Sequence, residues 1–438
     1  MIMERQDLME KVTALCKRRG FVYPSSEIYG GLGGMYDYGP YGVAIRRNIR
    51  NLWWRHVVEL RDDVVGLEAT IIAHPNVWVA SGHVQTFADP LVDCLGRCHR
   101  RWRADHLESD RCPECGGPLS EARPFNLMFK THVGPVEDSA SLVYLRPETA
   151  QGMFVDFKNV LNSMRVRVPF GIAQQGRSFR NEITHGNFIF RLREFEQMEM
   201  EFFVQPGDDE RWHAFWIEER HRWYVDVLGI RRECLRLREH EPDERAHYAK
   251  ASTDIEYQFP FGWGEVEGIA NRTDYDLAQH QRHSGQDLTY LDTETNERYL
   301  PYVVEPAVGV DRIMIVCLLD AYDEEEVKGE TRVVLRLHRD VAPVQVAVMP
   351  LSKKEDLIAP AREVQRALRG TFRVEYDQTG GNIGRRYRRQ DEIGTPFCVT
   401  IDFATLEDRA VTIRERDSME QERVPIAGLL ERLKERFA

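Results

Sequence analysis

RSFRNEITHGNFIFRLREFEQMEMEFF, residues 177–203, is the part of the chain that constrains its architecture most. Its ends alternate or run apolar, whereas THGN, residues 184–187, has the composition of a turn. This pattern predicts a hairpin of two long strands. Arginines and acids cluster on it around Phe195. Because arginine suits phosphate and an aromatic face suits a nucleobase, the hairpin is a candidate nucleotide site. A salt-bridged antiparallel sheet would have the same composition.

The sequence on either side of the hairpin predicts further strands and helices. A strand-to-helix passage occupies residues 299–322, where YLPYVVEPAVGVDR leads into IMIVCLLDAY. Upstream, a helix over 43–60 precedes a β-branched segment that ends at Pro75, and the charged segment 208–250 reads as helical. No internal repeat or low-complexity segment interrupts this order.

The C-terminal part has a different character. DEEEVKGETR, residues 323–332, reads as an acidic linker. After it, apolar strands over 344–351, 372–378 and 395–403 alternate with helical patterns. This alternation predicts a compact α/β domain in which helices cover a mainly parallel sheet. The chain therefore divides into residues 1–332 and 333–438.

Composition narrows the functional classes. The 438 residues carry a net charge of −12, which argues against a protein that coats nucleic acid nonspecifically but not against an RNA enzyme with local basic patches. The hydrophobic fraction of 42% fits a folded protein. No apolar run reaches the ~18–20 residues of a membrane helix, and the charged N-terminus lacks a signal-peptide core, so a cytoplasmic protein is expected.

Four of the eight cysteines lie together in a loop-like insertion, residues 92–122. Two close pairs separated by a short loop fit a tetrahedral zinc site better than a disulfide framework. The second pair, CPECGG, has the spacing of a metal knuckle, and the first has one more intervening residue. The alternative is a metal-free loop with four reduced thiols. The candidate ligands of one structural zinc are Cys94, Cys98, Cys112 and Cys115.

Three motifs resemble those of class II aminoacyl-tRNA synthetases. FRNE followed by RLREF, residues 179–195, resembles motif 2, and GVDR, residues 309–312, resembles motif 3. The helix and strand that end at Pro75 resemble motif 1, the dimer motif. The resemblance implies an overall α/β fold class: an α+β catalytic core, built on an antiparallel sheet with flanking helices, plus a C-terminal α/β anticodon-binding domain.

The resemblance extends to one subfamily, the dimeric bacterial glycyl-tRNA synthetases. WVASGH, FADPLVDC, RPETAQG, REFEQME, EGIANRTDYDL and PYVVEPAVGVDR carry it, and it runs from Arg19 to the C-terminus. It implies a glycine–tRNA ligase that uses ATP with Mg²⁺, acts on glycine and tRNA(Gly), and forms a homodimer. We also expect the basic run RRYRR to contact RNA through Arg385, Arg386, Arg388 and Arg389.

The same resemblance assigns the ATP site. Arg180 would bridge the α-phosphate and the amino-acid carboxylate, Arg191 would meet the β- and γ-phosphates, and Arg312 the γ-phosphate. Phe195 would stack on adenine, and Glu265 would help hold magnesium. Arg180, Glu182 and Arg312 are the expected catalytic residues. The full ATP set is Arg180, Asn181, Glu182, Phe190, Arg191, Leu192, Arg193, Glu194, Phe195, Glu265, Val266, Gly309, Val310, Asp311 and Arg312.

Glycine has no side chain, so the family recognises its ammonium with acids. The matching acids are Glu148, Glu199 and Glu305, and Arg272 would counter the carboxylate or hold these acids. Family members usually carry Ser where this chain has Ala307, so one pocket hydroxyl is missing. The full substrate set is Arg103, Glu148, Phe195, Glu196, Gln197, Met198, Glu199, Arg272, Glu305, Pro306, Ala307, Val308 and Gly309.

Three rival interpretations remain open at this point. A synthetase for histidine, threonine or proline would share the hairpin and the C-terminal domain. A non-catalytic paralogue would be expected to lose the phosphate arginines, yet Arg180, Arg191 and Arg312 are present. The third rival is an unrelated ATP-dependent ligase with a carboxylate substrate. Glu148 could also merely cap a helix, and Arg272 could be an ion-pair strut.

Overall fold

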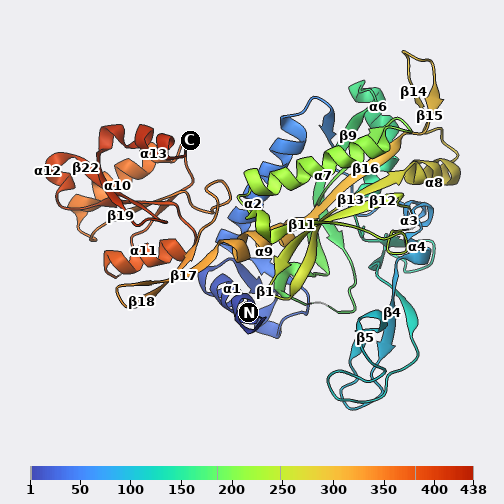
Figure 1. Ribbon diagram of the computed structural model, residues 1–438, viewed down its shortest axis with the longest axis horizontal. Helices are drawn as coiled ribbons and strands as arrows, with labels where there is room; N and C mark the ends of the chain where they lie inside the picture. Colours follow the sequence, from blue (N-terminus) through green and yellow to red (C-terminus); the bar gives the residue numbers. More distant parts are fainter. Residues whose placement is uncertain (1, 185, 247, 380, 438) are drawn as a thin grey trace.

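The computed structural model describes residues 2–184, 186–246, 248–379 and 381–437. In Figure 1 the N-terminal three quarters of the chain form one large body, and the orange-to-red C-terminal part forms a second body beside it. A small blue-green projection that carries β4 (Ala88–Asp93) and β5 (Arg101–Arg103) extends from the large body. Among the described residues, no helix is long and apolar enough to cross a membrane.

A seven-stranded sheet forms the centre of the large body. Its order is β11–β12–β13–β16–β10–β9–β3, and every neighbouring pair is antiparallel except β3 and β9. The antiparallel sheet predicted for the catalytic core is therefore confirmed. The strands are β3 (Val64–Gly66), β9 (Phe170–Phe179), β10 (Glu194–Val204), β11 (Leu235–Glu239), β12 (Ala251–Phe259), β13 (Gly262–Thr273) and β16 (Tyr302–Gly309).

The predicted hairpin is confirmed as β9 and β10, which pair from Phe179 and Glu194 to Phe170 and Phe203. Its turn includes residue 185, which lies outside the described residues. Successive side chains of a strand point to opposite faces, so β10 serves two environments. Met198, Met200 and Phe202 enter the largest apolar core, whereas Gln197 and Glu199 line a pocket.

Helices cover both faces of the sheet. On the Met198 face lie α2 (Pro40–Trp54), α7 (Asp209–Asp226) and α9 (Val310–Ala321), together with α1 (Ile2–Arg19). On the other face, α5 (Ala150–Val155), α6 (Phe157–Met164) and α8 (Tyr275–Ser284) share a second core with Phe203. The predicted passage from strand to helix at 299–322 is confirmed as β16 followed by α9.

Three predicted elements differ from the structure. The helix expected over 43–60 ends at Trp54 and continues as a π-helical turn, Arg55–Glu59, and the following strand is only β3. In the described part of the segment 208–250, the α-helix covers 209–226 and a 3-10 turn covers Arg232–Cys234, because the chain then supplies the edge strand β11. The acidic stretch is a hairpin of β17 (Tyr322–Val327) and β18 (Glu330–Leu335) rather than a linker. It is held by Arg332, which is fully buried and donates to Asp391 over 2.9 Å.

The C-terminal body has a five-stranded sheet, ordered β20–β19–β21–β22–β23. The predicted parallel arrangement holds for the first three strands, while β22 and β23 are antiparallel. The strands are β19 (Val346–Pro350), β20 (Val374–Tyr376), β21 (Phe397–Ile401), β22 (Ala410–Glu415) and β23 (Gln421–Pro425). The helices are α10 (Glu355–Leu368), α11 (Ile383–Glu392), α12 (Thr405–Asp408) and α13 (Leu429–Phe437).

The remaining elements are short. The projection completes a three-stranded sheet, β5–β4–β6, in which β4 pairs with both neighbours. The other strands and helices are β1 (Val22–Pro24), β2 (Tyr36–Tyr38), β6 (Arg123–Asn126), β7 (Lys130–His132), β8 (Leu142–Tyr144), β14 (Tyr290–Leu291), β15 (Arg298–Tyr299), α3 (Pro75–Ala80) and α4 (His83–Thr86).

Candidate active site

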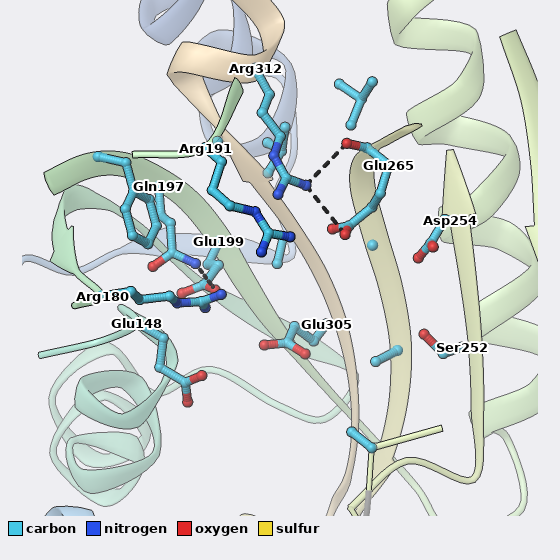
Figure 2. A pocket seen from close by; sticks show the side chains of 18 of the residues that line it. Glu148, Arg180, Arg191, Gln197, Glu199, Ser252, Asp254, Glu265, Glu305 and Arg312 are labelled. Atoms are coloured by element: carbon cyan, nitrogen blue, oxygen red, sulfur yellow. Dashed lines mark hydrogen bonds and ion pairs between the residues drawn. The ribbon is translucent and has the colours of Figure 1, made fainter. Parts of the chain in front are cut away.

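A pocket of about 400 Å³ opens on the sheet face that carries Glu199. Figure 2 shows arginines and carboxylates side by side around it: Arg180 lies near Glu148 and Glu199, and Arg312 lies near Glu265. Strands β10, β16, β13 and β12 supply the floor, and the chain between β9 and β10 supplies a wall. The pocket-lining residues that the sequence had singled out are Glu148, Arg180, Glu182, Phe190, Arg191, Leu192, Phe195, Gln197, Glu199, Glu265, Val266, Glu305, Ala307, Val308, Gly309, Asp311 and Arg312.

Arg180, at the end of β9, is fixed before any ligand arrives. Its Nε donates to the carbonyl oxygen of Pro147 over 3.0 Å. Its guanidinium lies 5.3 Å from the centre of the Phe195 ring and 5.4 Å from that of Phe87, within cation–π range. A positive charge held in this way is preorganised for an anion that enters the pocket.

Two further arginines face the same space, each beside an acid. Nη1 of Arg191 lies 3.5 Å from Glu182, and Nη1 of Arg312 lies 3.2 Å from Glu265. The charge of Arg312 lowers the pKa of Glu265 below its usual value. Carboxylate oxygens such as those of Glu265 are the ligands that Mg²⁺ prefers. Arg312 also lies in the first turn of α9, and a helix N-terminus favours anions.

The carboxylates of Glu148, Glu199 and Glu305 also line the pocket, the first two close to Arg180 (Figure 2). Glu199 accepts from the backbone N–H of Thr149 over 2.9 Å and from Nε2 of Gln197 over 2.8 Å. Glu148 lies 3.3 Å from Nε2 of His83. These are buried acids that face a shared space, which is the arrangement expected around a cation.

Burial and mutual repulsion perturb the three acids differently. Burial, together with the charges of Glu199 and Glu148, raises the pKa of Glu305 to about 8 against the pull of Arg272. Burial and the charge of Glu148 also raise the pKa of Glu199. Burial opposes ionisation of Glu148 as well, but the charge and hydrogen bond of His83, the charge of Arg272 and the hydrogen bond of Gln151 together outweigh it and lower the pKa of Glu148. A bound ammonium would relieve this repulsion.

Arg272 does not line the pocket but lies directly behind it. Its guanidinium is fully buried, donates to Glu305 over 2.9 and 3.0 Å, and donates to Asp276 over 2.7 and 2.9 Å. These hydrogen bonds all go to acids, so the interpretation of Arg272 as a strut for the acids fits the geometry. A direct contact with the substrate carboxylate does not, because the arginine is enclosed.

Several other predicted residues also lie outside the pocket. Arg193 donates to the carbonyl oxygens of Glu182 and Gly33, and Glu194 pairs with Arg177. Met198 is in the apolar core. Arg103 lies in the projection, between Asp89 and Asp105 at 3.0 and 2.6 Å. The remaining residues of this kind are Asn181, which follows β9 and donates its backbone N–H to the carbonyl oxygen of Leu127, and Glu196, Pro306 and Val310, which lie on β10, β16 and α9.

Asp311 and Glu196 belong to a network behind the site. Asp311 accepts a hydrogen bond from the hydroxyl of Tyr38 and another, over 3.0 Å, from the backbone N–H of Glu196. Arg46 of α2 lies 2.7 Å from Glu196 and 3.4 Å from Asp311. This network ties α2, β10 and the first turn of α9 together, so it fixes the place from which Arg312 extends.

The structure adds residues that sequence reasoning missed. His83, Tyr248 and Asp254 come from three distant segments and reach the acids or the pocket only in the fold. WVASGH was recognised as a motif without a role for its histidine. Asp276 carried a usable signal: Arg272 and Asp276 are four residues apart in NRTDYD.

The four clustered cysteines converge in the projection. Their Sγ atoms all lie within 4.8 Å of one another, with Cys94 3.5 Å from Cys115 and Cys98 3.4 Å from Cys112. Zinc–sulfur bonds of ~2.3 Å in a tetrahedron place sulfurs about 3.8 Å apart. The donor set and its spacing therefore fit zinc.

Comparisons with known proteins match both parts of the chain. The family described as tRNA synthetase class II core domain (G, H, P, S and T) matches residues 129–322, and that described as Anticodon binding domain matches residues 345–436. A prolyl-tRNA synthetase from Cryptosporidium parvum, solved with halofuginone and AMPPNP, has a TM-score of 0.68 at 17% identity; the match covers 97% of this chain and 75% of that chain. The fold and the pocket thus define a class II aminoacyl-tRNA synthetase.

Two relatives narrow the class. The glycine–tRNA ligase of Thermobifida fusca is 55% identical over 99% of both chains. That of Corynebacterium efficiens is 56% identical over 98% of both chains. This chain belongs to the glycine–tRNA ligase family, whose members join glycine to tRNA.

Proposed function

We propose that the pocket activates glycine with ATP and that the same chain then transfers glycine to tRNA(Gly). The observation that supports it best is the position of Arg180 beside Glu148 and Glu199 in one pocket (Figure 2). An arginine for phosphate and carboxylate, next to acids for an ammonium, matches the two ends of glycine and the α-phosphate that it attacks.

The chemistry needs no covalent enzyme intermediate. A glycine carboxylate oxygen forms a bond to the α-phosphorus while the bond to the bridging oxygen breaks, which gives glycyl-adenylate and pyrophosphate. Arg180 neutralises charge at the α-phosphate, and Arg191 and Arg312 neutralise it on the leaving pyrophosphate. Glu182 and Glu265 would hold Mg²⁺, which supplies further charge neutralisation. The terminal ribose hydroxyl of tRNA then attacks the glycyl carbonyl, and AMP leaves.

Pyrophosphate exchange across amino acids tests this assignment. Glycine should support exchange, whereas histidine, threonine and proline should not. A preference for one of those three would assign the pocket to the synthetase for that amino acid. The absence of exchange with any amino acid would favour a non-catalytic paralogue. ATP hydrolysis with another carboxylate would favour an unrelated ligase.

We infer that the C-terminal body, from about residue 333, binds the anticodon. The basic residues Arg385 and Arg388 lie on α11, of which Arg385 is exposed. Arg386 must be withdrawn from the predicted RNA contacts: it is 2% exposed and donates to carbonyl oxygens of Pro350 and Asp377. GGNIGRRYRRQ also includes residue 380, which lies outside the described residues.

A pair of variants separates these roles. Arg385→Ala should weaken tRNA charging and its salt dependence while glycine-dependent exchange stays at the wild-type rate. Arg386→Ala should instead lower the melting temperature. Unchanged tRNA affinity in Arg385→Ala and in Arg388→Ala would remove α11 from the RNA interface.

We also propose a structural zinc, a homodimer and a cytoplasmic location. The cysteine geometry supports zinc at Cys94, Cys98, Cys112 and Cys115. Motif 1 and the exposed apolar residues Ile28, Tyr29 and Leu32, which are 88%, 87% and 58% exposed, support a second copy as partner. Elemental analysis of protein purified without chelator tests the first, and sedimentation of wild type against Tyr29→Asp tests the second. Protein without zinc would refute the zinc site, and a monomeric wild type would refute the homodimer.

A further inference from the structure

Glu201 is a buried acid that the mechanism above does not use. It lies on β10, two residues beyond Glu199, and its side chain has no exposed area. Neither of its carboxylate oxygens forms a hydrogen bond with the described residues. An ionised carboxylate in such a place would be highly unfavourable, and a buried polar group without partners is rare. A residue of this kind is expected to have a role.

The strand register places Glu201 opposite Glu305. Glu199 pairs with Ala307 and Phe202 pairs with Val304. Two residues intervene on each strand and the register is the same at both pairs, so Glu201 stands opposite Glu305. Directly opposed residues have Cβ atoms about 4.5–5.5 Å apart, which brings two glutamate side chains within reach of each other. Glu305 itself lines the pocket, whereas Glu201 lies one layer further in.

Among the described residues, no cation donates a hydrogen bond to Glu201. Arg272 is close enough to act on it, but its bonds already go to Asp276 and Glu305. Burial and the charge of Glu305 raise the pKa of Glu201 well above its usual value. The raised pKa and the burial favour the neutral form of Glu201, which has one O–H to donate.

We propose that Glu201 is a positioning residue of the glycine pocket: a neutral carboxylic acid that, once a substrate ammonium has ionised Glu305, turns to donate a hydrogen bond to the Glu305 carboxylate and holds it for that ammonium. The proposal rests on the assignment of Glu148, Glu199 and Glu305 to that ammonium. The proton stays on Glu201 throughout, so no proton transfer is involved. The pocket gains a donor without a further negative charge.

If Glu201 had a purely structural role, its replacement would change the stability of the protein and not its glycine affinity. The positioning role predicts the following result. On the sheet face covered by α5 and α6, an apolar side chain would pack without a buried polar group. Glu201→Leu should therefore raise the melting temperature while it weakens glycine binding. A matched control is Glu267→Leu on β13. Glu267 is equally buried but paired with Arg220 over 2.6 Å, so its loss should lower the melting temperature and leave the glycine KM unchanged.

Pyrophosphate exchange and thermal melting of the full-length variants test the proposal. Glu201→Leu should raise the glycine KM about 10-fold or more, the effect of losing a hydrogen bond to a charged group, and leave the ATP KM unchanged. Glu201→Gln keeps an N–H donor and should restore most of the glycine affinity. In infrared difference spectra of wild type minus Glu201→Gln at neutral pH, the carbonyl band of a protonated carboxylic acid should be present.

Two results would overturn the role of Glu201: an unchanged glycine KM in Glu201→Leu, or a Glu201→Gln variant as impaired as Glu201→Leu. Absence of the protonated band would do the same, and it remains informative if the leucine variant fails to fold. Glu305→Gln separates the two levels of the argument. If that variant keeps the wild-type glycine KM, the assignment of the glycine site fails, whatever Glu201 does.

Discussion

Replacement of Arg272 by methionine should damage both the stability and the glycine affinity of the enzyme. Methionine keeps most of the side-chain length but removes the charge and the donors that hold Glu305 and Asp276 at 2.7–3.0 Å. Removing one partner of a buried ion pair costs about 3–5 kcal/mol, because the other charge is left uncompensated. For a cooperative unit of about 340 residues, that lowers the melting temperature by about 4–7 °C.

The loss should depend on pH in a defined direction. The pKa of Glu305 is raised to about 8, and Arg272 is the charge that opposes this rise, so it should climb further in the variant. Between the ordinary pKa of an unfolded glutamate, about 4.3, and this raised value, the folded state binds more protons than the unfolded state. Stability therefore falls as pH rises through this window. Wild type has the same slope below about pH 8, so the additional loss of the variant appears above this value, and it should be larger at pH 9 than at pH 5.5.

Calorimetry at the two pH values, with glycine-dependent pyrophosphate exchange alongside, checks both effects. The glycine KM should rise by about 10-fold or more, since Glu305 loses a charge-assisted hydrogen bond. Arg220→Met is the matched control: Arg220 is equally buried and pairs with Glu267 over 2.6 Å, but outside the pocket. It should be destabilised with a normal glycine KM. An Arg272→Met variant that is as stable as wild type, or one with an unaltered glycine KM, would refute the role of Arg272 as a strut for the acids.

Three further outcomes are expected. Arg180→Ala should reduce pyrophosphate exchange by about 10²–10³-fold without loss of folding, because one preorganised charge is removed; exchange near the wild-type rate would contradict its assignment. Binding of a non-hydrolysable glycyl-adenylate analogue at pH 7 should release protons, since an ammonium beside Glu305 lowers a pKa that starts at about 8; calorimetry in buffers of different ionisation enthalpy measures this, and zero release would count against it. Ala307→Ser adds a hydroxyl that faces the pocket and should change kcat/KM for glycine or for alanine by up to about 10-fold, because one hydrogen bond is worth ~0.5–1.5 kcal/mol. If neither value changes, position 307 has no part in substrate recognition. If wild type activates alanine comparably to glycine, the pocket is not glycine-specific.

Local patterns in the sequence predicted the parts of the fold that depend on neighbours along the chain. Alternation in residues 194–204 identified β10, and the apolar run after Gly309 identified α9. The acidic run before Arg332 was misjudged because its composition resembles a linker. Arg332, which holds the hairpin, pairs with Asp391, 59 residues away, and no local pattern reveals this contact.

The candidate site shows the same limit. Family motifs pointed to Arg180, Glu199 and Arg312, and the structure brings all three to one pocket. Arg386 looked like an RNA contact because a helix of arginines is basic in any register, whereas its burial depends on Asp377 and on the end of β19. Glu201 could not be distinguished from the other glutamates of EQMEME, since only the packing around it removes its partners.

The alternation of polar and apolar residues along β10 makes a shift in strand register strongly destabilising. A slip of one residue would rotate Glu199 and Glu201 into the apolar core and bring Met198 and Met200 to the substrate. Unpaired carboxylates among Trp216, Trp223 and their neighbours would destabilise that arrangement by far more than a typical point mutation does. A misregistered molecule would thus be eliminated by its own instability before it could offer the wrong pocket. The same alternation in β10 therefore supplies the pocket residues and disfavours the wrong register.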